Sequence, residues 1–258
     1  MDAQVVEMPS IKKLRQIITM VLFRMGLYEL RSINYTKMIM DTLMSMKYAT
    51  NTRLKRRFVA LDLGCGSGFF SRLLESMGFE VVSLDIDCEA LKNSMIARGD
   101  RPGISLLCAD AHSIPLKEGS VDLVIALSIY EHLESVDVAL RETARILKND
   151  GILIVQLPNL EYFIEPHTKF PMFLIPGRYK PLVASKIIDY YVNWDLNIKA
   201  FIELASREGL ILAKTMKYYH KLKTPPWPPS WFLMFVKRES NTLNREDIAY
   251  SSHLLRKQ

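Results

Sequence analysis

An alternation of apolar runs and amphipathic segments from residue 58 onward most constrains the fold of this chain. The apolar runs read RFVALDLG, FEVVSLDID, ISLLCAD, VDLVIALS and GILIVQLPN, and helical spacing appears in FFSRLLESMG, CEALKNSMIARG and SVDVALRETARILKNDG. Solid apolar runs are typical of strands that are buried on both faces. The alternation therefore predicts an α/β fold, in which βαβ units form a parallel sheet with helices on both sides.

The alternation stops at residue 160. Residues 160–194 carry four prolines among many aromatic residues, and long insertions in compact domains usually serve as lids or binding loops. A helix over 196–209 and two strand candidates, LILAKTMKYY and WFLMFVKRE, follow. We expect a main domain over 58–239 with a lid over 160–194, a helical basic extension over 1–57 and a polar tail over 240–258.

The positive charge is concentrated at the beginning of the chain. The formal net charge is +6, and residues 1–57 contain 11 Lys/Arg against 4 Asp/Glu. A basic segment of this kind attracts the phosphates of nucleic acid or anionic lipid, although it is also typical of a solvated helix that covers the domain. Peripheral membrane contact and RNA binding both stay open. No apolar run reaches the roughly 18 to 20 residues that span a bilayer.

The three cysteines, Cys65, Cys88 and Cys108, show no paired or metal-ligand spacing. Reduced thiols in a cytoplasmic protein without a metal site are the simplest interpretation.

The first strand ends in a carboxylate and a glycine-rich turn. Asp62 precedes Gly64, Gly66 and Gly68. Dinucleotide-binding loops usually read G-x-G-x-x-G, which suits a pyrophosphate. The G-x-G-x-G spacing with an acid two residues earlier suits a cationic ligand better, because a carboxylate attracts an ammonium group and repels a phosphate.

Two further acids end the next strands. Asp85 can accept hydrogen bonds from both hydroxyls of a ribose, although it could instead cap a helix and Asp87 is a near rival. Asp110, with the backbone of Ala111 beside it, can bind the amino edge of an adenine. Ribose, adenine and an amino-acid moiety without phosphate together indicate S-adenosylmethionine.

The motifs LDLGCGSG, LDID, CADAHSIPLKEGSVDLVIALSIYEHL and LKNDGILIVQLPN resemble those of the class I S-adenosylmethionine-dependent methyltransferases, in the small-molecule branch. The resemblance implies a Rossmann-like, seven-stranded sheet of order 3-2-1-4-5-7-6 with an antiparallel seventh strand. It implies S-adenosyl-L-methionine as cofactor and S-adenosyl-L-homocysteine as product. Transferred to this sequence, it assigns Asp62, Gly64, Cys65, Gly66 and Gly68 to the methionine part, Asp85 and Ile86 to the ribose and adenine, Asp110 and Ala111 to the adenine edge, and Leu127 and Ser128 to the region of the sulfonium.

Methyl transfer to an oxygen atom benefits from a general base. His132, after the fourth strand, and His167, in the insertion, are the candidates. Tyr130, Glu131 and Asn159 are expected on the same rim, where they would orient a polar substrate. The Asn/Asp-Pro-Pro-Tyr motif of amine-methylating enzymes is missing, so we expect an oxygen acceptor on a small molecule, a sugar, or a glycan- or lipid-linked substrate. An RNA methyltransferase and a non-catalytic cofactor-binding protein are the alternatives.

Overall fold

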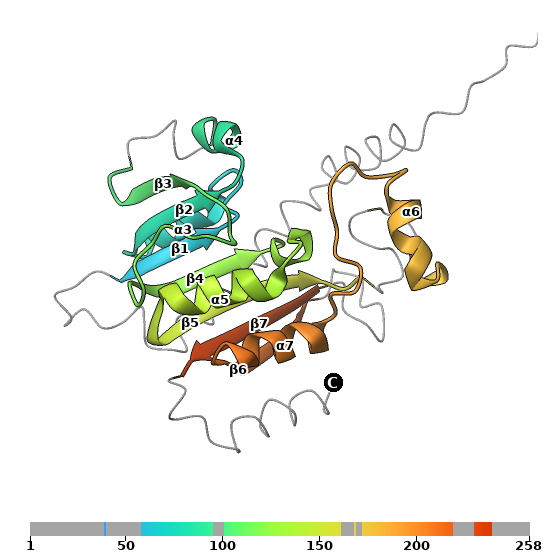
Figure 1. The fold of residues 1–258 in the computed structure, drawn as a ribbon. Helices are drawn as coiled ribbons and strands as arrows, with labels where there is room; N and C mark the ends of the chain where they lie inside the picture. Colours follow the sequence, from blue (N-terminus) through green and yellow to red (C-terminus); the bar gives the residue numbers. More distant parts are fainter. Residues whose placement is uncertain are drawn as a thin grey trace, which may run out of the picture.

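The computed structural model of the chain describes residues 39, 58–94, 101–160, 168, 172–218 and 230–238. Their centre is a seven-stranded sheet of order β3-β2-β1-β4-β5-β7-β6 (Figure 1). The strands β1 to β5 pair in parallel, whereas β7 is antiparallel to both β5 and β6, as expected. In chain order the strands are β1 (Val59–Leu63), β2 (Glu80–Asp85), β3 (Ile104–Cys108), β4 (Val121–Leu127), β5 (Leu147–Pro158), β6 (Leu210–Tyr218) and β7 (Ser230–Lys237).

Helices cover both faces of the sheet. The α5 and α7 helices contribute Leu140 and Phe201 to one apolar cluster, and α3 contributes Leu74 to a second cluster on the opposite face. The described helices are α3 (Phe69–Ser76), α4 (Cys88–Lys92), α5 (Val136–Ile146), α6 (Lys180–Ala184) and α7 (Ile198–Arg207), with 3₁₀ turns η1 (Tyr130–His132), η2 (Met172–Leu174) and η3 (Gly177–Tyr179). None of these described helices is long and apolar enough to cross a bilayer.

The central strands are apolar on both sides because both sides are buried. Along β4, Val124 and Ala126 belong to the cluster under α5, while Leu123 and Ile125 belong to the cluster under α3. The same division holds along β5. Successive side chains of a strand point to opposite faces, so a strand covered twice reads as a solid apolar run.

Two element boundaries differ from the sequence-based expectation. The helix predicted over 135–151 ends at Ile146, and β5 begins at Leu147, which pairs with Val121. The register shifts between Val121 and Leu123, so the polar KNDG segment is accommodated as an irregular start of β5. The described part of the helix predicted over 88–99 ends at Lys92, and residues 95–100 lie outside the described residues.

The insertion after β5 has a small apolar cluster of its own. Its members are buried side chains from the end of α6, from the segments on both sides of it and from just after β5. They are Leu160, Met172, Ala184, Ile187, Ile188 and Val192. Within the predicted lid, Met172 is buried whereas Leu174 is 66% exposed. Of the basic extension, only Ile39 is described; it is helical and packs into the cluster under α3.

Candidate functional site

The parallel pairing of β1, β2 and β3 places three acids at one edge of the sheet. Asp62 pairs in register with Ser83 on β2, and Asp85 pairs with Cys108 on β3, two residues before Asp110. The carboxyl ends of these strands point the same way (Figure 1). Such an edge is where open α/β sheets bind ligands.

The amides of the glycine loop are used within the protein. Gly64 and Cys65 donate to the carbonyl oxygen of Leu84 over 2.8 and 3.0 Å, and Gly68 donates to Cys65 over 2.9 Å. Gly66 donates to Asp85 Oδ2 over 2.8 Å. These four amides are therefore not available to a phosphate. The acids around the loop, Asp62 and Asp85, favour a cation instead.

Glycine at position 64 is required by close packing and by conformation. Its φ is +71°, and a Cβ there would lie 2.8 Å from Cδ1 of Ile129, in the loop after β4. Gly66 has φ +50°, is exposed, and a Cβ would meet nothing within 4 Å. The loop after β1 is thus pressed against the loop after β4, while open space lies over Gly66.

Asp62 is a buried acid in a short hydroxyl chain. It is 4% exposed, its Oδ2 accepts from Ser71 Oγ over 2.5 Å, and Ser83 Oγ donates to Ser71 Oγ over 2.7 Å. Desolvation by burial raises the pKa of Asp62 from 3.8 to about 6, against the effect of the Ser71 hydrogen bonds. The same desolvation, with Asp62 and Asp85 nearby, raises the pKa of the Cys65 thiol to about 12. Cys65 is therefore a neutral, buried turn residue.

The roles of Asp85 and Asp87 separate cleanly. Asp87 caps α4, because its Oδ1 accepts from the amides of Glu89 and Ala90 over 3.1 and 2.9 Å. Asp85 does not cap the helix; its oxygens accept from Gly66 and from the Asp87 amide. A carboxylate has about four acceptor positions, so Asp85 keeps capacity for ribose hydroxyls. Ile86, beside it, is 68% exposed and offers an apolar surface to a ring.

Asp110 forms a pair with His112 that the sequence did not reveal. Its Oδ1 accepts from the His112 amide over 2.9 Å and from His112 Nδ1 over 2.6 Å, and the amide hydrogen bond is the main cause that lowers the pKa of Asp110. Asp110 is exposed and Ala111 is buried. The carboxylate thus has a fixed orientation at the end of β3.

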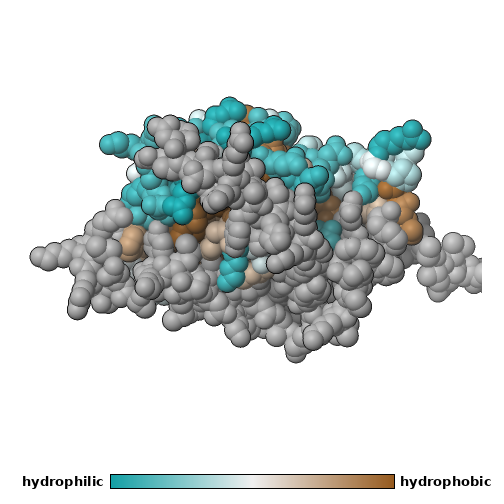
Figure 2. All heavy atoms as spheres, turned by 90° about the horizontal axis from the view of Figure 1, so that it is seen from below, coloured by the Kyte–Doolittle hydropathy of each residue, from teal (hydrophilic) through white to brown (hydrophobic). Residues whose placement is uncertain are grey.

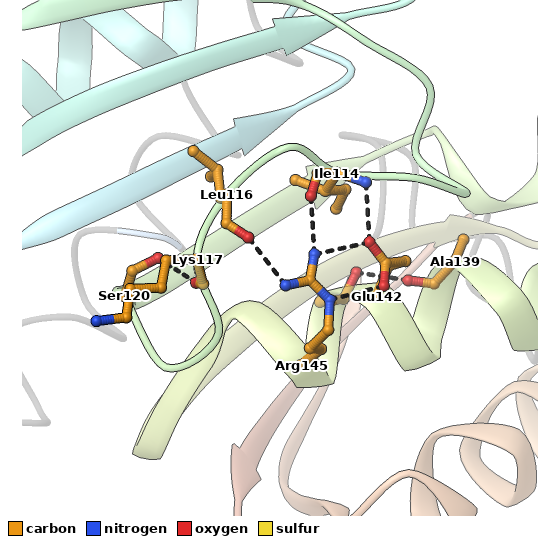
Figure 3. A network of polar contacts seen from close by, with 8 residues as sticks. Ile114, Leu116, Lys117, Ser120, Ala139, Glu142 and Arg145 are labelled. Atoms are coloured by element: carbon orange, nitrogen blue, oxygen red, sulfur yellow. Dashed lines mark hydrogen bonds and ion pairs between the residues drawn. The ribbon is translucent and has the colours of Figure 1, made fainter.

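A polar network on α5 holds the loop that follows this pair (Figure 3). Arg145 donates to the carbonyl oxygens of Leu116 and Ile114 over 2.9 and 2.8 Å, and to both carboxylate oxygens of Glu142. Glu142 also accepts from the Ile114 amide over 2.9 Å. The guanidinium of Arg145 lowers the pKa of Glu142. Glu142 thus joins α5 to the loop that begins at Ile114.

The cysteine expectation is also wrong in part. Cys88 and Cys108 form a disulfide with their Cα atoms 5.2 Å apart, and Cys108 is exposed, not a core residue. The pair is 20 residues apart in sequence, and the register of β2 with β3 brings the two ends together. The spacing of the cysteines in the sequence did not indicate this disulfide. The disulfide joins the segment after Asp85 to the strand before Asp110.

The end of β4 contains a strained serine and a buried amide. Ser128 has φ 57°, and its hydroxyl donates to Gln156 Oε1 on β5. Gln156 is fully buried, and its Nε2 has no hydrogen-bond partner among the described residues. Leu127 is half-buried. Sequence reasoning missed Gln156, although a glutamine inside the apolar run GILIVQLP was a visible signal.

The residues expected to line the site after β4 are largely buried. Tyr130 is fully buried, its hydroxyl lies 2.9 Å from Thr143 Oγ1 and its ring contacts Phe201, so its assignment to the rim is wrong. Burial also raises the pKa of Tyr130, which stays neutral. Glu131 is 1% exposed, and Asn159 is half-buried. His167 lies outside the described residues.

His132 contacts both Glu131 and the insertion. Its Nδ1 lies 2.9 Å from the carbonyl oxygen of Tyr191, and its ring meets the Tyr190 ring edge to face at 5.3 Å between centroids. A carbonyl only accepts, so the neutral ring carries its proton on Nδ1 and a lone pair on Nε2. Nε2 lies 3.9 Å from Glu131 Oε1, a carboxylate that stabilises an imidazolium.

These residues fit S-adenosylmethionine and do not fit a dinucleotide. Four loop amides are used within the protein, the space over Gly66 is open, and Asp62, Asp85 and Asp110 lie at or just after the ends of three neighbouring strands. An ammonium, a ribose and an adenine suit three acids at such an edge better than a pyrophosphate does.

Comparisons with known proteins agree with this reading. A family model described as methyltransferase domain matches residues 61–155. An uncharacterized protein of Methanocaldococcus jannaschii is 29% identical over 194 residues, which cover 72% of this chain and 81% of that protein. A Mycobacterium tuberculosis protein, named as a probable S-adenosylmethionine-dependent methyltransferase, is 32% identical over 99 residues, or 38% of this chain and 35% of that protein. A malonyl-[acyl-carrier protein] O-methyltransferase of Hamiltonella defensa is 30% identical over 101 residues, or 39% of this chain and 38% of that protein.

Among solved structures, an S-adenosylmethionine-dependent methyltransferase from Mesorhizobium loti matches with a TM-score of 0.57 and 18% identity, over 70% of this chain and 91% of that chain. This likeness supports the fold. The matches to the two named relatives cover only about a third of each relative's length.

Proposed function

Since residues 61–155 are a class I S-adenosylmethionine-dependent methyltransferase domain, we propose that this protein transfers the methyl group to an oxygen atom of a small molecule, a sugar, or a glycan- or lipid-linked acceptor. The observation that carries the proposal is the orientation of His132. His132 follows β4, and the Tyr191 carbonyl of the insertion holds its Nδ1, which leaves the Nε2 lone pair as the base.

S-adenosylmethionine supplies an electrophilic methyl group on a sulfonium, so the reaction needs alignment more than covalent help. Asp85 would accept from the ribose hydroxyls and Asp110 would orient the adenine, while Asp62 would supply negative charge under the glycine loop. The His132 Nε2 removes the proton from the acceptor hydroxyl as the oxygen attacks. Glu131, 3.9 Å from that nitrogen, stabilises the imidazolium that results.

An oxygen acceptor also has support from a relative's name, because the Hamiltonella defensa protein is an O-methyltransferase. The test is transfer of a tritiated methyl group from S-adenosylmethionine to a cell extract that is then fractionated into RNA, lipid, glycan and small metabolites. We expect label in a non-RNA fraction, bound as an ether or ester. Label in RNA would favour the RNA alternative, and saturable cofactor binding with no labelled product in any fraction would favour the non-catalytic one.

The cofactor assignment is tested with Asp85→Ala. Loss of the ribose acceptor should weaken S-adenosylhomocysteine binding about tenfold or more, measured by isothermal titration. Asp137→Ala, an exposed change on α5, is the matched control and should bind as the unchanged protein does. Full-strength binding by Asp85→Ala contradicts the assignment.

The base is tested with His132→Asn, which keeps a donor for the Tyr191 carbonyl. The turnover rate should fall about 100-fold or more, while the dissociation constant of S-adenosylhomocysteine stays the same. Removing a base should also flatten the acidic limb of the pH–rate profile. An unchanged rate across the pH range removes His132 from this role.

A further inference from the structure

The insertion contains a cavity of about 770 Å³ beside α6. Its floor is formed by Ala184, Ile188 and Val192, three buried members of the insertion's apolar cluster. The cavity is therefore built on a small packed core of its own. Figure 1 places α6 beyond the carboxyl ends of β4 and β5.

The cavity shares its wall with the candidate site. Tyr190, Tyr191 and Asn193 line it, and the same three residues contact η1. Tyr190 meets the His132 ring, Tyr191 accepts from His132 Nδ1, and the Asn193 amide donates to the Glu131 carbonyl oxygen over 2.8 Å. The cavity and η1 therefore share residues 190–193, so a molecule in the cavity lies close to the candidate base.

The cavity is lined by aromatic rings and by both hydrogen-bond donors and hydrogen-bond acceptors. Tyr190, Tyr191 and Trp194 supply rings, and both tyrosines are more than 40% exposed. Asp189 and Asp195 supply acceptors, and Arg178 supplies donors. In Figure 2 hydrophobic and hydrophilic atoms lie side by side at the right-hand end of the molecule, the side where Figure 1 shows α6.

The charged side chains and aromatic rings of the cavity lining favour one class of ligand over others. Two carboxylates against one guanidinium disfavour a phosphate or carboxylate ligand. A quaternary ammonium would use the rings and the acids, but it would leave the donors of the lining without acceptors. A neutral ring that carries several hydroxyls can use the donors, the acceptors and the aromatic faces together.

We propose that this cavity binds a neutral carbohydrate ring, the part of the methyl acceptor that lies away from the reacting oxygen. The proposal rests on the proposed function, because it extends the acceptor of that reaction. Arg178 and Asn193 donate to ring hydroxyls, Asp189 and Asp195 accept from them, and Trp194 and the tyrosines cover the apolar face of the sugar. Remote binding of this kind holds the acceptor for reaction next to His132.

The test uses saturation-transfer difference NMR on the full chain with S-adenosylhomocysteine bound. The probes are methyl β-glucoside, methyl α-mannoside and maltose, with choline and glycerol 3-phosphate as charged comparisons. We expect transfer to at least one neutral sugar and not to the charged probes. Transfer to choline or glycerol 3-phosphate alone, or to no probe, overturns the proposal, while S-adenosylhomocysteine binding by the same sample leaves the methyltransferase function standing.

Variants locate the binding. Trp194→Ala should weaken sugar binding about tenfold or more and leave S-adenosylhomocysteine binding unchanged. Leu182→Ala, on α6 and 61% exposed but outside the cavity lining, is the matched control. Asp195→Asn keeps a hydroxyl acceptor and removes a charge, so a sugar should still bind. Sugar binding that survives Trp194→Ala overturns the assignment to this cavity.

Discussion

At the scale of single residues, the most unusual group is the Asp62 carboxyl. Burial raises its pKa from 3.8 to about 6. The folded state therefore holds the proton more tightly than the unfolded state, so the stabilising effect of protonation is complete below pH 3.8 and is lost as the pH rises through 6. Above that pH Asp62 is a buried anion, and its charged neighbour among the described residues is another acid, Asp85. Such a place favours a cationic ligand.

We predict that Asp62→Asn stabilises the protein without ligand at pH 8 and has little effect near pH 4. The gain at pH 8 should approach about 3 kcal/mol, because two pKa units correspond to that free energy. Urea unfolding at both pH values measures it. The same variant should bind S-adenosylmethionine more weakly, since the charge that faces the ligand is gone. An equal stability change at both pH values would contradict the burial argument.

The sequence could predict those residues whose positions depend on their immediate neighbours in the chain. Asp62, Gly64 and Asp85 follow from a strand end and a turn, which the sequence records directly. Tyr130 could not be placed, because its burial depends on Thr143 on α5 and Phe201 on α7, which contact it only in the folded protein. The hydrogen bond between the Ser71 and Ser83 hydroxyls could not be predicted either, because the two side chains meet only in the folded protein.

At the scale of elements, the disulfide joins two neighbouring parts of the candidate site. Cys88 begins α4 and Cys108 ends β3, so the bridge links the segment that contains Asp85 and Ile86 to the strand that precedes Asp110. It thus connects the proposed ribose side of the site to the proposed adenine side. Prediction failed here because cysteine pairing depends on strand register, which spacing does not reveal.

We predict that opening this bridge lowers stability and cofactor affinity together. A cross-link over a loop of 20 residues is worth about 3 kcal/mol in chain entropy. Dithiothreitol should lower the melting temperature of the unchanged protein and weaken its S-adenosylhomocysteine binding. The control is the double variant Cys88→Ser with Cys108→Ser, which should behave like the reduced protein and not respond to dithiothreitol. A response of equal size in that variant would assign the effect elsewhere.

At the scale of the whole molecule, the alternation of elements predicted the covered parallel sheet, and the family resemblance supplied the strand order. Residues 160–194 were expected as an insertion, but the apolar cluster and the cavity within it were not foreseen. Four prolines and scattered aromatics carry no helical or strand period, so sequence alone could not show which of them pack together. The short α6 and its neighbours are defined by tertiary packing.

The place of β7 inside the sheet has a consequence for synthesis. This strand fills the gap between β5 and β6, although both of them precede it in the chain. During synthesis, the edge of β5 that pairs with β7 has unpaired backbone groups until residues 230–237 leave the ribosome. The edge of β6 that pairs with β7 is unpaired until then as well. A nascent chain that still lacks β7 therefore has an incomplete sheet with exposed, unpaired strand edges. Chaperone binding to the nascent chain should peak just before β7 leaves the exit tunnel.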